Sequence, residues 1–269
     1  MPDGNMSPTP ETEAAIRAAR SAQRRADSRE GADAVTFKEG IDIVTAADVA
    51  CEDAIRDELT RSFPRYPVVG EERGGTSRDD TPYWLVDPIC GTRCYASNVP
   101  LYCSNIALVE QGEVTAAAIG VGKTGELFYA QRGAGAWLLE PGTTSEPRQL
   151  TVSEHSNTLW IGGRGQAYAD VAHRVALRDR WYLWTFTSSV CYAYLAAGRI
   201  SGLIHFAYDA AYKDPPVHTA AGCFVAQEAG AIVTDLDTGE PWSLQSRAFL
   251  LAATEALHHD LRDLAAVST

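Results

Sequence analysis

The sequence predicts a layered α/β protein, and three observations support that fold class. In the first half of the chain, helices are followed by apolar runs that glycine-containing turns separate, which is typical of an antiparallel sheet. In the second half, strands alternate with helices, which indicates a mixed sheet with crossover helices. The 269 residues, of which 45% are hydrophobic, suffice for an extensive core.

The amino-terminal half is expected to begin with a disordered tail over residues 1–11, which is polar and contains proline. A helix is predicted over 13–29, which is rich in Ala, Arg and Glu. A second is predicted over 48–61, where apolar residues recur at helical spacing. The predicted strands of this half cover 68–69, 83–86, 106–109, 114–121, 126–130 and 136–139.

The carboxy-terminal half alternates between the two kinds of element. Strands are predicted over 159–161, 181–186, 200–206, 231–234 and 248–252, and helices over 167–177, 189–197, 215–229 and 255–267. The polar, turn-rich segment 141–148 favours a boundary there. We therefore predict an amino-terminal α+β lobe over 12–145 with an antiparallel sheet, and a carboxy-terminal α/β lobe over 146–269 with a mixed sheet.

Charge and hydropathy narrow the possible partners. The net charge is −12, and no run of Lys or Arg offers a nucleic-acid backbone a basic surface. No stretch approaches the ~18 apolar residues of a membrane span, and the polar start lacks the apolar core of a signal peptide. We expect a cytoplasmic protein that acts on a small molecule and binds neither nucleic acid nor membrane.

Two acidic motifs follow predicted strands, at the strand ends where α/β proteins usually build their sites. The first is Gly70-Glu71-Glu72, and the second is Asp87-Pro88-Ile89-Cys90-Gly91-Thr92. Proline and glycine in the second motif predict a tight turn that aims the Asp87 carboxylate, the Ile89 carbonyl and the Thr92 hydroxyl at one point. From these residues alone, a simple turn and a metal site both remain open.

These motifs resemble those of the inositol monophosphatase family, over roughly residues 12–265. The segments Asp42-Ile43-Val44-Thr45, Ala196-Ala197-Gly198-Arg199 and Glu228-Ala229-Gly230 add to the resemblance. It implies an αβαβα sandwich like that of inositol monophosphatase and fructose-1,6-bisphosphatase, a homodimer, and hydrolysis of a phosphate ester with two or three Mg²⁺ ions.

The resemblance also assigns roles by position. Glu71, Asp87 and the Ile89 carbonyl would hold the first Mg²⁺, and Thr92 with Glu71 would orient the attacking water. Asp48 and Lys38 would support the site from the amino-terminal side. Arg93 follows Thr92 and is a candidate for binding an anionic group of the substrate, while the Gly91-Thr92 backbone N–H groups are candidates for holding an oxyanion.

The sequence departs from the family at the second metal. Cys90 and His218 stand where the family has two aspartates. Thiol and imidazole suit Mg²⁺ poorly, whereas Asp87, Cys90, His218 and a water suit tetrahedral Zn²⁺. Asp214 lies four residues before His218, and a helix starting at Asp214-Pro215 would place both on one face, where Asp214 could bind substrate or supply the missing carboxylate.

Three interpretations follow. The favoured one makes Cys90 a nucleophile, His218 its base and Asp87 the orienting carboxylate, for acyl or group transfer, hydrolysis or cyclisation at a carbonyl-type carbon. The alternative is a phosphomonoesterase on a sugar, inositol or nucleotide phosphate, with Mg²⁺ at Glu71 and Asp87 or Zn²⁺ at Asp87, Cys90 and His218. The third is a non-catalytic binding module, which would need no metal.

Overall fold

The computed structural model describes residues 7–38, 42–77, 80–142, 146–186, 188–207 and 216–266. The helices are α1 (Pro10–Asp27), α2 (Ala46–Ser62), α3 (Thr92–Ala96), α4 (Gly165–Ala176), α5 (Val190–Ala196), α6 (Ala220–Glu228) and α7 (Glu255–Ala265). The strands are β1 (Val35–Phe37), β2 (Ile43–Thr45), β3 (Val68–Gly70), β4 (Tyr83–Cys90), β5 (Cys103–Glu110), β6 (Glu113–Val121), β7 (Leu127–Gln131), β8 (Gly135–Leu139), β9 (Arg148–Gln149), β10 (Thr158–Gly162), β11 (Tyr182–Trp184), β12 (Gly202–His205), β13 (Ile232–Asp235) and β14 (Phe249–Ala252).

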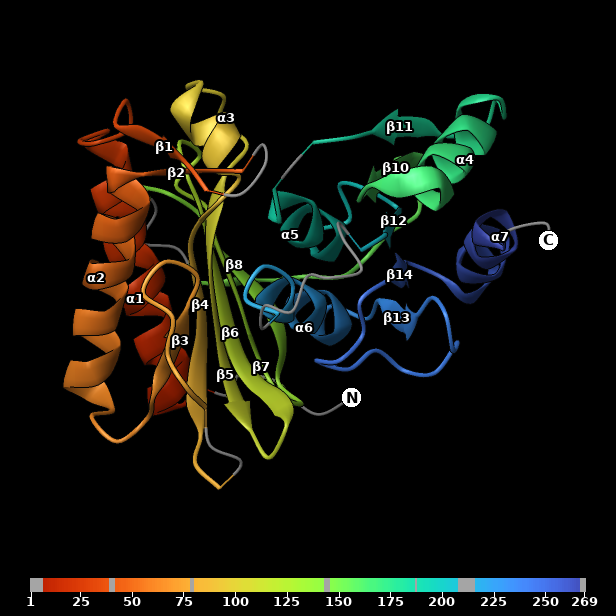
Figure 1. Cartoon of the computed structure of the whole chain (residues 1–269). Helices are drawn as coiled ribbons and strands as arrows, with labels where there is room; N and C mark the ends of the chain where they lie inside the picture. Colours follow the sequence, from red (N-terminus) through yellow and green to blue (C-terminus); the bar gives the residue numbers. More distant parts are fainter. Residues whose placement is uncertain are drawn as a thin grey trace.

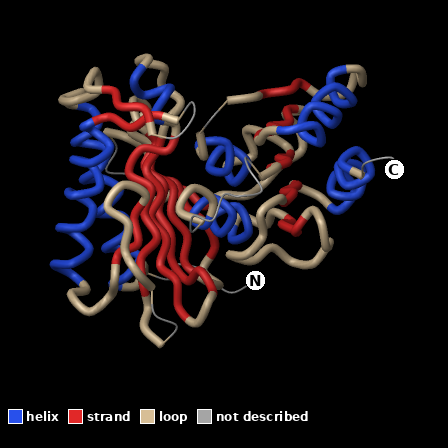
Figure 2. The backbone as a smooth tube through the Cα atoms, in the orientation of Figure 1, coloured by secondary structure: helices blue, strands red, loops and turns tan. Residues whose placement is uncertain are grey.

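These elements stack as five layers, which confirms the predicted αβαβα sandwich (Figure 1). Helices α1 and α2 cover the outer face of a seven-stranded sheet of order β3-β4-β5-β6-β7-β8-β9. Helices α5 and α6 lie between that sheet and a five-stranded sheet of order β11-β10-β12-β14-β13, whose other face is covered by α4 and α7 (Figure 2). The first sheet is antiparallel apart from the β3–β4 pair, and the second is mixed.

Helix α1 starts at Pro10, so residues 10 and 11 belong to the helix and not to the predicted tail, of which residues 1–6 lie outside the described residues. Thr9 caps the helix, since its side chain accepts a hydrogen bond from the Thr12 backbone N–H at 3.2 Å, and proline is favourable in the first turn. One face of α1 is built of buried alanines, so the helix lies very close to β6. A side chain at Gly120 of β6 would come 3.1 Å from the Ala19 carbonyl oxygen. The small residues on both elements therefore set this close packing.

Strand β4 runs four residues beyond the predicted 83–86. Its pairing with β5 shifts register between Asp87 and Cys90, so Pro88 lies in a β-bulge and not in a tight turn. The chain turns only at Gly91, whose φ of 97° is left-handed and starts α3. The bulge sets the directions in which Asp87 and Cys90 leave the strand.

Helix α6 begins at Ala220, five residues after the predicted start at 215. Residues 216–219 form a turn, in which the Thr219 and Ala220 N–H groups donate to the Pro216 carbonyl at 3.2 and 2.9 Å. The expected helical face shared by Asp214 and His218 is therefore wrong, because His218 precedes the helix. Asp214 itself lies outside the described residues.

Three features were not predicted from the sequence. These are the β1–β2 hairpin, the short helix α3, and β9, which extends the first sheet beyond the predicted lobe boundary at residue 145. Within the described residues, none of the helices has both the length and the apolar character needed to cross a membrane.

The Glu228 carboxylate ties α6 to the β7–β8 turn. It accepts hydrogen bonds from the Gly133 N–H at 3.1 Å and the Gly135 N–H at 3.0 Å. Both glycines have positive φ, so the turn conformation and the carboxylate depend on each other. This contact holds α6, and with it the turn that carries His218, against the first sheet.

We expect Glu228→Ala to lower the free energy of unfolding by about 1–3 kcal/mol, because charged hydrogen bonds to the turn are lost. The matched control is Glu113→Ala, which removes an exposed ion pair with Arg132 and should cost under about 1 kcal/mol. Denaturant titration of both variants measures the difference. Equal losses would show that Glu228 does not hold the turn.

Candidate active site

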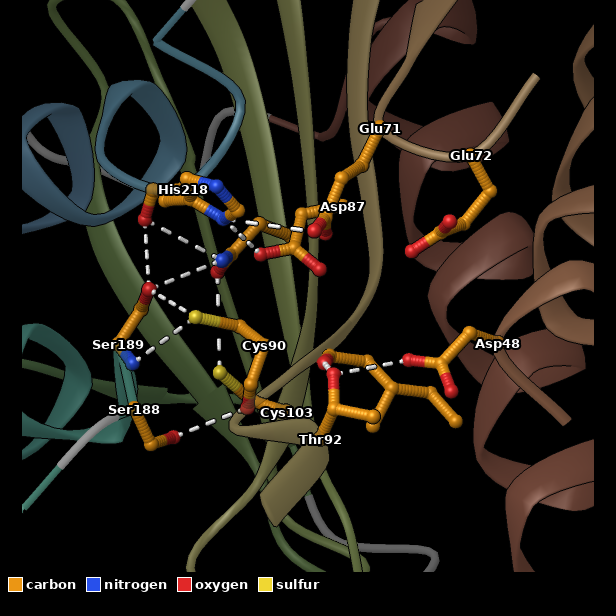
Figure 3. Close-up of polar contacts among 12 residues, drawn as sticks. Asp48, Glu71, Glu72, Asp87, Cys90, Thr92, Cys103, Ser188, Ser189 and His218 are labelled. Carbon is orange, nitrogen blue, oxygen red and sulfur yellow. Dashed lines mark hydrogen bonds and ion pairs between the residues drawn. The ribbon is translucent and has the colours of Figure 1, made fainter. Parts of the chain in front are cut away.

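Five segments bring polar side chains together around the end of β4 (Figure 3). Glu71 follows β3, Asp87 and Cys90 come from the end of β4, Asp48 from the first turn of α2, Ser189 from the residue before α5, and His218 from the turn before α6. The two acidic motifs found in the sequence therefore meet side chains from the second half of the chain.

Asp87 is the centre of this cluster. Its side chain is fully buried, and its Oδ2 lies 2.7 Å from His218 Nδ1. Its other oxygen, Oδ1, is buried without a hydrogen-bond partner among the described residues. Burial alone would lower the pKa of His218, but the Asp87 and Glu71 carboxylates raise it well above its usual value. The two carboxylates therefore favour the charged form of His218.

Glu71 adds a second carboxylate to the cluster. Its Oε2 lies 3.9 Å from His218 Nδ1, and burial together with the nearby Asp87 charge raises its pKa. Lys38 Nζ, next to the β1–β2 hairpin, lies 3.1 Å from Glu71 Oε1 and 2.7 Å from Glu72 Oε1. Burial opposes the charge on Lys38, yet these two carboxylates raise its pKa. The cluster thus attracts cationic groups from two sides.

The turn that presents Glu71 and Glu72 rests on Glu52, a residue that the sequence analysis did not single out. The buried Glu52 carboxylate accepts the Glu72 N–H at 2.7 Å and the Arg73 N–H at 3.1 Å, and it pairs with Arg56 Nε at 2.8 Å. A Cβ at Gly70 would lie 2.1 Å from Glu52 Oε1, so glycine is required there. Glu52 therefore fixes the backbone that carries Glu71.

Cys90 belongs to a hydrogen-bond network that leaves its sulfur as a thiol. Cys90 Sγ lies 2.7 Å from Ser189 Oγ and accepts the Ser189 N–H at 3.2 Å. Ser189 Oγ donates to the His218 carbonyl at 2.6 Å and accepts from Asn105 Nδ2 at 3.1 Å. A hydrogen bond with Cys103, burial, and the Asp87 charge raise the pKa of Cys90 well above its usual value. A thiolate nucleophile is thus disfavoured.

Thr92 pairs with Asp48 at the opposite edge of the cluster. Its hydroxyl lies 3.0 Å from Asp48 Oδ1 and 3.1 Å from the Ile89 carbonyl. Asp48 also accepts the Thr45 N–H at 2.8 Å, which caps α2. Burial raises the pKa of Asp48 to about 6. The carboxylate that contacts the Thr92 hydroxyl is thus that of Asp48.

Some of the predicted site residues lie together in the cluster, and others lie at its edge. Asp87, Cys90 and His218 each offer a ligand atom within 4.8 Å of the others. Gly91 starts α3, and Arg93 is exposed on that helix. The sequence analysis missed three supporting residues, which are Glu52, Asn105 and Ser189. A pattern was present only for Glu52, which lies one helical turn after Asp48 on the apolar face of its helix.

Comparison with known proteins relates the chain to one family. The model of the inositol monophosphatase family matches residues 7–267. An inositol-1-monophosphatase of Rhizobium meliloti is 32% identical over 213 residues, or 76% of each chain, and the Nus factor SuhB of Vibrio cholerae is 31% identical over 232 residues, or 84% of this chain and 85% of its own. The solved structure of the Thermotoga maritima IMPase matches with a TM-score of 0.81 at 25% identity, covering 96% of this chain and 97% of the other.

We expect iodoacetamide to modify Cys94 faster than Cys90 in metal-free protein at neutral pH. The thiolate is the reactive form, each pKa unit changes its population about tenfold, and Cys90 is the more buried of the two. Peptide mass spectrometry over a time course measures both rates, with Cys94→Ser as the control for peptide assignment. Faster modification of Cys90 would restore the nucleophile interpretation.

Proposed function

The chain belongs to the inositol monophosphatase family, and on that basis we propose that it hydrolyses the phosphate monoester of a small polar molecule. The curated relative from Rhizobium meliloti is named an inositol-1-monophosphatase, and one from Thermotoga maritima a fructose-1,6-bisphosphatase/inositol-1-monophosphatase. Sugar, inositol and nucleotide phosphates are the substrate classes to test. A homodimer stays a prediction from the family resemblance.

The observation that carries the proposal is the buried carboxylate of Asp87 with one oxygen unpartnered among the described residues, next to Glu71. The buried Asp87 carboxylate and the partly buried Glu71 carboxylate repel each other, and oxygen donors are what a hard divalent cation prefers. These donors fit Mg²⁺ held by Glu71, Asp87 and the Ile89 carbonyl. Bound there, Mg²⁺ supplies Lewis-acid polarisation of a phosphate ester and lowers the pKa of water.

The chain's own residues would then orient the attacking water. The Thr92 hydroxyl donates to Asp48, which leaves the lone pairs of Thr92 Oγ1 free to accept a hydrogen bond from water. Ionised Asp48 holds the hydroxyl in that direction and accepts its proton as the water is deprotonated. Lys38 balances the charge of Glu71 and Glu72. Arg93, exposed beside Thr92, and the Gly91 N–H are the proposed contacts to the anionic substrate.

The nucleophile interpretation is not carried forward. The Ser189 hydroxyl donates to the His218 carbonyl, so its oxygen is available as an acceptor for the Cys90 thiol. His218 contacts Asp87 through Nδ1 and is held in its charged form, so it is a poor base for the thiol. Both observations favour the phosphomonoesterase alternative.

We expect the purified chain to release phosphate from at least one sugar, inositol or nucleotide monophosphate in the presence of Mg²⁺. Glu71→Gln and Asp87→Asn should each lower kcat at least about 10²-fold, equivalent to roughly 3 kcal/mol of transition-state stabilisation. Glu13→Gln, on the exposed face of α1, should leave kcat unchanged. Phosphate release that is indifferent to Mg²⁺ and to both variants would contradict the proposal.

The pH profile should show the ionisation of Asp48. Since burial raises its pKa to about 6, kcat/KM should fall about tenfold per pH unit below that value. Asp48→Asn should give a slower enzyme whose profile lacks this acidic limb. An acidic limb that persists in Asp48→Asn would assign the titration to another group.

A further inference from the structure

We propose that Asp87, Cys90 and His218 form a zinc site beside the Mg²⁺ ligands, so that the centre pairs one hard and one borderline cation. The inference rests on the proposed function, because it places Zn²⁺ and Mg²⁺ in the same phosphatase centre. It concerns the identity of the second cation, which Cys90 and His218 determine.

The first support is geometric. One ligand atom from each of the three residues lies within 4.8 Å of the other two. Asp87 and Cys90 leave the same strand on either side of the Pro88 bulge, and His218 comes from the turn before α6 (Figure 3). Donors this close need only a small adjustment to meet one ion at the ~2.0–2.3 Å bond lengths of zinc.

The second support is the chemistry of the donors. A thiolate and an imidazole are ligands that Zn²⁺ takes readily, whereas Mg²⁺ requires oxygen in an octahedron. Three protein ligands leave a fourth tetrahedral position for a water or a substrate oxygen, which is the pattern of catalytic zinc sites. The same three residues are therefore matched to Zn²⁺ and mismatched to a second Mg²⁺.

The third support is an unpartnered polar atom within the cluster. Asp87 is fully buried, and its Oδ1 has no hydrogen-bond partner among the described residues. Asp87 Oδ2 already contacts His218. The Asp87 carboxylate can thus bind a cation through Oδ1 while Oδ2 remains next to the His218 imidazole, the other ligand of the same zinc ion.

The fourth support is the network that orients the donors. The Ser189 N–H donates to Cys90 Sγ at 3.2 Å, an interaction that stabilises a metal-bound thiolate. Ser189 Oγ and Asn105 Nδ2 both donate to the His218 carbonyl, at 2.6 and 3.3 Å. Hydrogen bonds to ligand residues fix their orientation and raise metal affinity. Ser189 and Asn105 are positioning residues that link the sulfur and imidazole ligands.

Binding is a ligand exchange without oxidation or reduction. The Cys90 thiol releases its proton to solvent as the Zn–S bond forms, and a ring nitrogen of His218 binds after giving up any proton that it carries. The Asp87 carboxylate supplies an oxygen lone pair.

The test is titration of the metal-free full chain with Co²⁺, which substitutes for Zn²⁺ and absorbs visible light. One equivalent should produce a near-ultraviolet sulfur-to-cobalt charge-transfer band, which Zn²⁺ abolishes by displacement and excess Mg²⁺ does not. Cys90→Ser should lose the band, and His218→Asn should weaken Co²⁺ affinity at least about tenfold. The control is Cys94→Ser, which replaces the half-buried cysteine of α3. This variant should keep both the charge-transfer band and the Co²⁺ affinity.

Absence of the band from the wild-type chain, or its persistence in Cys90→Ser, would overturn the site. Should Cys90→Ser fail to fold, X-ray absorption of the zinc-loaded wild-type chain decides instead. One sulfur among the zinc neighbours supports the site, and a shell of nitrogen and oxygen alone overturns it. Mg²⁺-dependent phosphate release without the band refutes only the zinc site, whereas the band without phosphate release refutes only the proposed function.

Discussion

The buried carboxylate of Asp87 is the constraint on which the rest of the site depends. An ionised carboxylate without solvent costs several kcal/mol unless opposite charge and hydrogen bonds compensate it. His218 provides that compensation on one side at 2.7 Å, while Glu71 adds repulsion that Lys38 offsets. One oxygen of Asp87 has no partner within the described residues. The arrangement is stable as an acceptor of cations and is poorly suited to an apolar ligand.

Several elements of the layered fold position Asp87 and the charged side chains around it. The Pro88 bulge shifts the register of β4 against β5 between Asp87 and Cys90. Glu52 of α2 holds the turn that carries Glu71, and Glu228 of α6 holds the element that follows His218. Helices from both faces of the first sheet therefore hold residues around the end of β4. A substitution at Glu52, Pro88 or Glu228 would therefore shift a charged side chain of the site. In the low dielectric constant of the protein interior, such a shift has a large electrostatic cost.

By the resemblance, the family has aspartates where this chain has Cys90 and His218, and such a difference changes the charge of the cluster. Aspartate at both positions would add two more negative charges to a buried cluster, and those charges demand a second hard cation. A thiol and an imidazolium instead leave the cluster closer to neutral in the absence of metal. Such a centre needs Mg²⁺ less for its structure than a cluster of four carboxylates would.

The sequence predicted the layers and the main elements well, because the apolar periodicity of the long strands and helices is strong and the family motifs order them. It also put Asp87, Cys90 and His218 in one cluster, by resemblance. It missed the Pro88 bulge, the late start of α6 and the β1–β2 hairpin, since local turn preferences do not report tertiary pairing. The raised pKa of the Cys90 thiol could not be predicted either, because Ser189, Asn105 and Cys103 come together around it only in the folded chain.

The role of the carboxylate cluster as a cation site can be measured directly by anomalous diffraction from crystals soaked in Mn²⁺, which stands in for Mg²⁺. We predict an anomalous peak bonded to the carboxylates of Glu71 and Asp87 and to the carbonyl of Ile89, with Thr92 still hydrogen-bonded to Asp48. A map without a peak there, in which Lys38 remains the partner of Glu71 at saturating Mn²⁺, would contradict the account.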